Sequence, residues 1–116
     1  MSNKFISVLM GSDSDLSTVQ TTLDTLNALA IPFEVKITSA HRTPDDTRRY
    51  VFDAEERGCA VFVAAAGLAA HLAGTVAALT LKPVIGIPMD AGPLNGHDAL
   101  LSTVQMPGGI PVACVA

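Results

Sequence analysis

Short apolar runs alternate with segments of helical periodicity along the whole chain. Five runs have the length and composition of strands and lie at residues 5–10, 33–38, 59–65, 84–87 and 111–115. Segments whose apolar residues recur at helical spacing lie between them, at residues 16–30, 44–57, 69–80 and 97–104. This alternation predicts an α/β fold of three layers, in which helices cover both faces of a parallel sheet.

The ends of two predicted elements add detail. Thr43 is expected to cap the helix that begins at Pro44, and Gly58 is expected to end it. The run at residues 111–115 is of a buried type, but no helical segment follows it. We therefore expect a partner subunit or a further C-terminal helix to cover that strand. Because no linker or repeat divides the chain, residues 1–116 are expected to form a single domain.

Composition excludes several classes of function. The 116 residues carry 7 Lys and Arg against 11 Asp and Glu, and the chain has one Tyr and no Trp. Without a basic stripe or stacking aromatic residues, the chain is not expected to bind nucleic acid. No apolar stretch is long enough to span a membrane, and the N-terminus has no signal-peptide pattern. These features predict a cytoplasmic protein.

Three loops are expected to meet at one edge of the sheet, because ligands of open parallel sheets bind beyond the carboxyl ends of the strands. The loop after the first strand consists of Gly11, Ser12, Asp13, Ser14 and Asp15. The loop after the second strand contains Ser39, Ala40, His41 and Arg42. The segment after the third strand contains Ala66, Gly67, Ala69, Ala70, His71 and Leu72. All of these residues are candidates for a small-molecule site.

The chemistry of these residues suggests a ligand that carries both an anion and hydroxyl groups. His41 is the candidate for proton transfer, since imidazole changes charge near neutral pH. Arg42 can bind a phosphate or carboxylate with its planar set of donors. Ser12 and the backbone N–H groups of its loop can bind an anion, and Asp15 suits a hydroxyl, although both residues are also common helix caps. His71 either contributes to the site or caps the next helix.

Other reaction types lack their markers. The three histidines do not have the paired spacing of zinc ligands, and Cys59 and Cys114 stand alone in apolar runs, so no metal site and no disulfide are expected. His97 is expected to be a surface residue. The chain contains no GxSxG, GxGxxG or CxxC motif, which leaves hydrolase, dinucleotide-binding and redox functions without support.

Four segments resemble the signature segments of one family, in order and with compatible spacing. They are MGSDSD at residues 10–15, SAHRTP at 39–44, GLAAHLAG at 67–74 and LLSTVQMPGGIPVA at 100–113. The family is that of N5-carboxyaminoimidazole ribonucleotide mutases, the catalytic subunits of phosphoribosylaminoimidazole carboxylase (class I PurE). The resemblance implies a flavodoxin-like fold, a homo-octamer, and transfer of a carboxylate from the exocyclic nitrogen to carbon 4 of an aminoimidazole ribonucleotide, without metal or organic cofactor.

The same resemblance implies roles for individual residues. His41 corresponds to the general acid and base, whereas Ser12, Asp15 and Arg42 correspond to substrate-binding positions. The chain departs from the family pattern GAGGAAHLPG at Ala65, Leu68 and Ala73. An alanine in place of glycine is expected to be tolerated unless the backbone needs a positive φ. Family members also continue past Ala116 into a further helix, so the domain at 1–116 is expected to lack that element.

Three alternatives remain at this stage. A direct carboxylase would use the same fold and loops but take free aminoimidazole ribonucleotide and carbon dioxide. A related carboxylase domain would act on a pyridine mononucleotide, although its usual N-terminal region has no counterpart here. A non-catalytic nucleotide-binding module of flavodoxin-like fold would leave His41 without a role.

Overall fold

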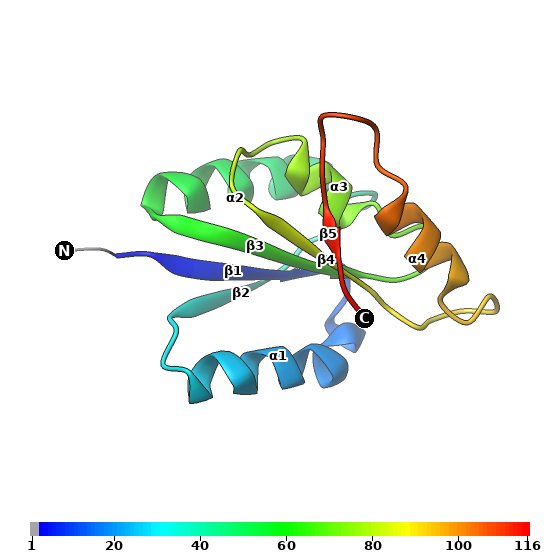
Figure 1. Ribbon diagram of the computed structural model, residues 1–116, viewed down its shortest axis with the longest axis horizontal. Helices are drawn as coiled ribbons and strands as arrows, with labels where there is room; N and C mark the ends of the chain where they lie inside the picture. Colours follow the sequence, from blue (N-terminus) through cyan, green and yellow to red (C-terminus); the bar gives the residue numbers. More distant parts are fainter. Residues whose placement is uncertain (1–2) are drawn as a thin grey trace.

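The computed structural model describes residues 3–116, which fold around one parallel sheet of five strands (Figure 1). The strands are β1 (Phe5–Met10), β2 (Phe33–Ile37), β3 (Cys59–Ala66), β4 (Val84–Pro88) and β5 (Ala113–Cys114). Their order across the sheet is β2-β1-β3-β4-β5, and every neighbouring pair is parallel. This order is that of flavodoxin-like folds, as the sequence predicted.

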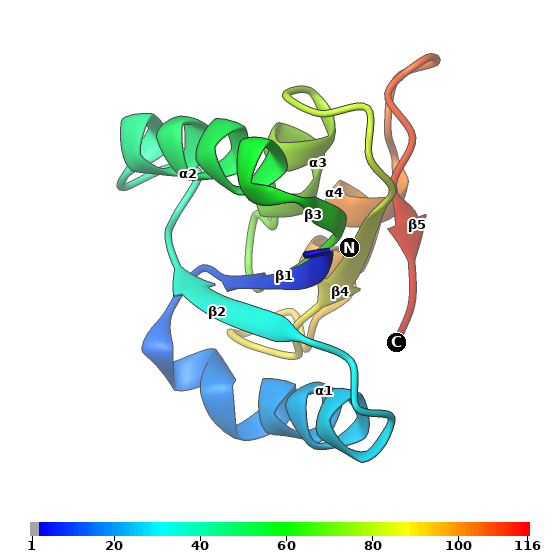
Figure 2. The ribbon, with the colours of Figure 1, turned by 90° about the vertical axis from the view of Figure 1, so that its left-hand side faces the viewer.

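Helices cover both faces of the sheet. They are α1 (Leu16–Ala28), α2 (Pro44–Arg57), α3 (Leu72–Ala77) and α4 (His97–Val104), and a 3₁₀ turn, η1 (Asp13–Asp15), precedes α1. Figure 2 shows α1 on one face of the sheet and α2 and α3 on the other. Helix α4 packs on the same face as α3, because Gly86 of β4 lies against both Thr103 and Ala73. None of the helices within residues 3–116 has the length and apolar character needed to cross a bilayer.

The strands separate two apolar clusters, since successive side chains of a strand point to opposite faces. Val8 and Met10 of β1 pack with Val19 and Leu23 of α1, and all four are almost completely buried. On the other face, Leu9 packs with the α2 and α3 side chains and with Phe62 of β3. Full burial of each large apolar side chain contributes about 1.5–3 kcal/mol. The two clusters hold the sheet and its carboxyl edge in place.

Two predicted elements are shorter than expected. Helix α3 spans only Leu72–Ala77. Leu68 before it has a φ of +58°, which is outside the right-handed helical region, and the N–H group of Ala70 donates to Ser102 Oγ. Strand β5 is limited to Ala113–Cys114, next to Pro111, which has no N–H group to offer a neighbouring strand. The other strands and helices fall close to their predicted ranges.

The start of α2 differs from the prediction in its chemistry. The helix does run from Pro44 to Arg57, and Gly58 ends it in the left-handed conformation with a φ of +109°. Thr43 stands at the N-cap position, but its side chain makes no capping hydrogen bond. The Thr43 hydroxyl instead contacts the backbone of Ser39, in the preceding loop.

Candidate functional site

A cleft of about 460 Å³ lies at the carboxyl edge of the sheet, where the loops after β1, β2 and β3 meet. It is lined by Gly11, Ser12, Ser14, Asp15, Ser39, Ala40, His41, Arg42, Ala66, Gly67, Leu68, Ala69, His71, Leu72 and Ala91. The chain winds from β1 outward to β2 and then back to β3 on the other side of β1, so the loops diverge at this point and leave room for a ligand.

The loop after β1 begins a 3₁₀ turn. Ser12 Oγ accepts a hydrogen bond from the N–H group of Ser14 at 3.2 Å and lies 2.9 Å from Ser14 Oγ. The N–H group of Gly11 donates to the carbonyl of Ala65, which ties this loop to the end of β3. Ser12 therefore serves as a cap and also lines the cleft.

Asp15 is the half-buried carboxylate of the cleft. Its burial raises its pKa above the usual value, and a backbone hydrogen bond at Ser12 only partly offsets this effect. Desolvation disfavours the charged form of the carboxyl group. A hydrogen-bond donor of a ligand would therefore stabilise the Asp15 carboxylate.

The loop after β2 presents His41 and Arg42. Ser39 Oγ accepts hydrogen bonds from the N–H groups of His41, at 3.3 Å, and of Arg42, at 3.0 Å. The N–H group of Thr43 donates to the carbonyl of Ser39 at 2.9 Å. These bonds curl the backbone into a compact turn, from which both the imidazole and the guanidinium remain exposed at the cleft.

The imidazoles of His41 and His71 are in direct contact. His41 Nε2 lies 2.8 Å from His71 Nδ1, and the two rings meet edge to face at 78° with their centroids 4.8 Å apart. One of the two nitrogens must carry the proton between them and the other must accept it. His71 stands at the N-cap position of α3 without a capping side-chain bond, so its side chain belongs to the cleft.

The loop after β3 approaches its neighbour closely. A Cβ atom on Gly67 would lie 3.1 Å from Ala91 Cβ and 3.4 Å from Met89 Cβ, which explains why a residue without a side chain stands there. Leu68 follows in the left-handed conformation, at a position where the resemblance places a glycine. A non-glycine residue in that conformation costs about 1–2 kcal/mol.

The structure brings together thirteen of the fifteen candidate residues, and Asp13 and Ala70 are the two that do not line the cleft. Asp13 is exposed in η1, and Ala70 is buried with its N–H group bonded to Ser102. Sequence reasoning missed Leu68 and Ala91. Ala91 follows β4, and the rule that directed attention to the ends of β1, β2 and β3 applies equally to that strand.

Other singled-out residues lie outside the cleft. His97 is exposed at the start of α4, with its Nδ1 2.8 Å from the carbonyl oxygen of Leu94. Cys59 is buried and its thiol donates to the carbonyl of Val61, and Cys114 is half-buried and unpaired with another cysteine. Across residues 3–116, no three His, Cys, Asp or Glu side chains gather closely enough to hold a metal ion.

A larger groove of about 740 Å³ lies at the opposite edge, near the amino ends of β4 and β5. Its lining is largely apolar, with Glu55 and Lys82 as its charged residues. It contains none of the candidate residues. The chemistry of the chain is therefore concentrated at the carboxyl edge.

The fold and the cleft define a flavodoxin-like α/β protein with a candidate small-molecule site at the point where the strand order reverses. Residues 5–116 match the family described as AIR carboxylase, and the chain belongs to that family. An N5-carboxyaminoimidazole ribonucleotide mutase of Pyrococcus horikoshii is 52% identical over 111 residues, which cover 96% of this chain and 63% of the relative. The mutase of Pseudomonas aeruginosa is 54% identical, with coverage of 96% and 68%.

The fold of the chain is also similar to solved structures. The crystal structure of Treponema denticola PurE superimposes with a TM-score of 0.88 at 27% sequence identity, covering 97% of this chain and 72% of that one. The chain spans about two thirds of the length of the mutases it matches.

Proposed function

We propose that the chain is the catalytic domain of an N5-carboxyaminoimidazole ribonucleotide mutase of purine biosynthesis. The observation that carries this proposal is the His41–His71 contact, which sets a proton-transfer pair at the rim of a cleft of suitable size. The names of the mutases from Pyrococcus horikoshii and Pseudomonas aeruginosa support the assignment of the reaction.

The substrate is held through its ribose phosphate and its imidazole ring. Arg42 and the N–H groups of the loop after β1 are suited to the phosphate, and Ser12 and Asp15 to the phosphate and the ribose hydroxyls together. Ser39 Oγ accepts two backbone N–H groups, and its own proton remains available to a ligand. The small residues Ala66, Gly67 and Ala69 leave space for the flat ring.

The reaction needs a group that first donates a proton to the substrate and later accepts one from it. Protonated His41 gives its proton to the exocyclic nitrogen as the N–C bond to the carboxylate breaks, which releases carbon dioxide and the free amine. Carbon 4 of the electron-rich ring then attacks the carbon dioxide, and the resulting tetrahedral carbon gives its proton back to His41. No proton, atom or electron is gained overall. The cleft keeps the carbon dioxide beside carbon 4, which replaces a bimolecular encounter by a local one.

We further propose that the protein forms a homo-octamer in the cytoplasm. Exposed apolar side chains support the assembly, among them Val35 and Ile37 on β2 and the fully exposed Leu81. Light scattering tests the oligomeric state directly, and a stable monomer at micromolar concentration would contradict the assembly.

A direct carboxylase that takes free aminoimidazole ribonucleotide is the second candidate. Two names support this second candidate: the family is described as AIR carboxylase, and a relative from Ogataea methanolica is named phosphoribosylaminoimidazole carboxylase. Both enzymes would need His41 and the same cleft.

Turnover assays separate the candidates. The purified protein is given the N5-carboxylated ribonucleotide alone, or free aminoimidazole ribonucleotide with bicarbonate. Rapid use of the first substrate and negligible use of the second is the expected result. The reverse preference would assign the direct carboxylase. If neither substrate reacts while the ribonucleotide still binds, a non-catalytic module is the better description. His41→Asn should abolish turnover and retain binding.

A further inference from the structure

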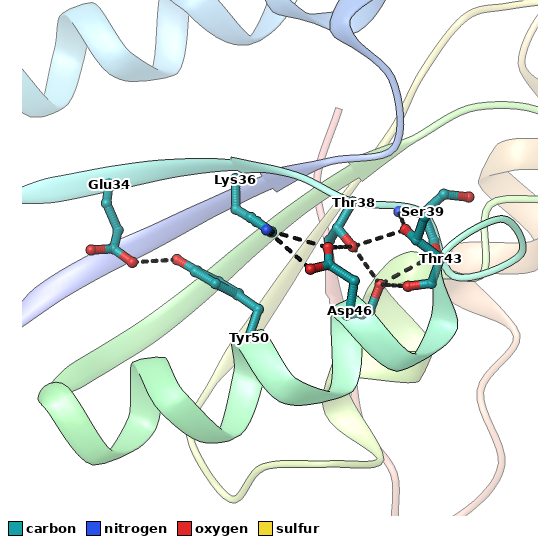
Figure 3. Close-up of polar contacts among 8 residues, drawn as sticks. Glu34, Lys36, Thr38, Ser39, Thr43, Asp46 and Tyr50 are labelled. Atoms are coloured by element: carbon teal, nitrogen blue, oxygen red, sulfur yellow. Dashed lines mark hydrogen bonds and ion pairs between the residues drawn. The ribbon is translucent and has the colours of Figure 1, made fainter.

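Thr38, the residue after β2, is a buried polar junction beneath the candidate site. It is 3% exposed, and its hydroxyl donates to Asp46 Oδ2 at 2.8 Å. The same oxygen lies 2.7 Å from Thr47 Oγ1, and Thr47 must donate in that contact because the single proton of Thr38 is already used. Figure 3 shows how Thr38 joins the end of β2 to the first turn of α2.

Thr43 extends this junction to the loop that carries His41. Its hydroxyl lies 3.2 Å from Thr38 Oγ1 and accepts a hydrogen bond from the N–H group of Ser39 at 2.9 Å. Ser39 in turn accepts the N–H groups of His41 and Arg42. A continuous series of hydrogen bonds therefore leads from Asp46, through two threonines and a serine, to the backbone of His41.

Asp46 is kept ionised by its neighbours. The hydrogen bond from Thr38, together with the hydrogen bond and charge of Lys36, lowers the pKa of its carboxyl below the usual value. Lys36 Nζ lies 3.2 Å from Asp46 Oδ2 and 3.3 Å from Oδ1. The carboxylate also stands in the first turn of α2, where the helix dipole favours a negative charge.

Apart from bonds of Thr47 to the carbonyls of Ser39 and Thr43, the loop has few attachments to the rest of the fold. His41, Arg42 and Thr43 are exposed, and Ala40 is the one loop residue packed against the apolar core. Its position relative to α3 therefore depends on the polar contacts at its base. The 2.8 Å contact between His41 and His71 requires accurate placement, since the two rings come from separate loops.

We propose that Thr38 and Asp46 are positioning residues for the reaction: they hold the 39–43 loop so that His41 stays within hydrogen-bond distance of His71. Neither residue lines the cleft, so both act through the loop. The kinetic part of this inference rests on the proposed function, whereas the structural part does not.

A second contact between the same strand and helix provides a matched control. Tyr50 of α2 donates to Glu34 Oε1 of β2 at 2.7 Å (Figure 3). Its hydroxyl also lies 3.0 Å from Ser7 Oγ. This contact also joins α2 to the sheet, one helical turn beyond Asp46, but neither of its hydrogen bonds reaches the 39–43 loop. Tyr50→Phe removes it without touching the site.

The test compares Thr38→Val, Thr38→Ser, Asp46→Asn and Tyr50→Phe. Thr38→Val keeps the shape of the side chain. The Thr47 hydroxyl, freed from Thr38, can then donate to the carbonyl of Thr43, 3.1 Å away, so the variant should fold. We expect kcat for the N5-carboxylated ribonucleotide to fall ~10–100-fold in Thr38→Val, with KM within ~3-fold, because a small misplacement of a catalytic group has effects of that size. The kcat of Asp46→Asn should lie between those of Thr38→Val and the wild type. Thr38→Ser should keep most of the wild-type kcat.

Amide hydrogen exchange provides a readout that does not need turnover. The N–H groups of Arg42 and Thr43 should exchange at least ~10-fold faster in Thr38→Val, while amides in β1 and β3 should keep their rates. In Tyr50→Phe, both kcat and the exchange of these two amides should remain as in the wild type.

Two results would overturn the inference: wild-type kcat and exchange rates in both Thr38→Val and Asp46→Asn, or an equal loss of kcat in Tyr50→Phe. If the wild-type protein fails to convert the substrate, the proposed mutase function fails, and the exchange rates alone decide whether Thr38 and Asp46 hold the loop.

Discussion

His41 Nε2 and His71 Nδ1 lie 2.8 Å apart, although 29 residues separate them in the chain and each belongs to a different loop. The contact fixes which nitrogen of each ring can exchange a proton with the other. It leaves the remaining nitrogen of each ring to other partners. A substrate in the cleft therefore meets two coupled imidazoles.

Replacement of His71 should reveal what this contact contributes. His71→Phe removes the hydrogen bond, so we expect kcat to fall ~100-fold, the usual range for a lost proton-transfer partner. His71→Asn retains a side-chain amide that can bond to His41, and its loss should be smaller, ~10-fold. Steady-state kinetics give both values.

His97→Asn is the matched control for these variants, because His97 is exposed at the start of α4, away from the cleft. It should leave kcat unchanged. A His71→Phe enzyme with wild-type kcat would show that the contact has no catalytic role.

Asp15→Asn should weaken binding without weakening the fold. Burial raises the pKa of Asp15, so the folded protein holds a proton more readily than the unfolded chain, and stability is reduced at every pH above the folded-state pKa. A neutral amide removes that penalty, and the melting temperature near pH 7 should be equal to or above that of the wild type. Loss of a charged acceptor should raise KM ~10–100-fold.

Asp24→Asn, on the exposed side of α1, is the control for Asp15→Asn and should change neither quantity. Calorimetry and steady-state kinetics test the pair. A marked drop in melting temperature for Asp15→Asn would contradict the assigned cause of the raised pKa.

Gly86→Ala should destabilise the protein by about 1–3 kcal/mol through overpacking. An added Cβ would lie 2.5 Å from Thr103 Cγ2 and 2.9 Å from Val112 Cγ1, so α4 or β5 would have to move. Ser102, next to Thr103, accepts the N–H group of Ala70, and a shift of α4 should therefore also reduce activity. Gly108→Ala is the control, since nothing lies within 4 Å of its added Cβ. Urea unfolding measures the free energy of unfolding of both variants. Equal values would contradict the predicted overpacking at Gly86.

The Glu34–Arg57 ion pair should make stability fall at acid pH. The hydrogen bonds and charge of Arg57 lower the pKa of Glu34, so this contribution is present above the unfolded pKa, near 4.3, and is lost as the pH falls through the folded-state value. Both side chains are partly exposed, so the effect should be modest and weaker in 0.5 M salt.

Arg57→Gln should flatten the decline in the free energy of unfolding between about pH 5 and 3, as measured by urea titration at each pH. Arg48, on the same helix, contacts the Phe52 ring. The Arg48→Gln variant is the control and should keep the wild-type slope. Identical slopes for Arg57→Gln and the wild type would show that the ion pair does not cause the loss of stability at acid pH.

Much of the fold could be predicted from local patterns. Pro44 and Gly58 mark the two ends of α2, because proline is favoured at the first helical position and glycine just past the last. The apolar run of β3 indicates a strand buried on both faces. Topology then brings Ser12, His41 and His71 to one edge without any knowledge of their contacts.

The finer geometry depends on contacts between distant segments. The bond between Ala70 and Ser102 of α4 joins two segments 32 residues apart, which no local pattern contains. The Thr43 hydroxyl had two suitable partners in the sequence, its own helix and Ser39, and only the folded loop decides between them. The distance between the His41 and His71 rings likewise depends on the shape of two turns.

The attachment of the loop after β3 has a consequence for the order of folding. Every charged or hydroxyl-bearing residue that lines the cleft lies within the first 71 residues of the chain. The restraints on their last loop come later: Met89 donates its N–H group to Ala66, and Ser102 accepts that of Ala70. During synthesis on the ribosome, the reactive groups emerge well before the segments that align them. The nascent chain thus completes the cleft only once its second half has docked.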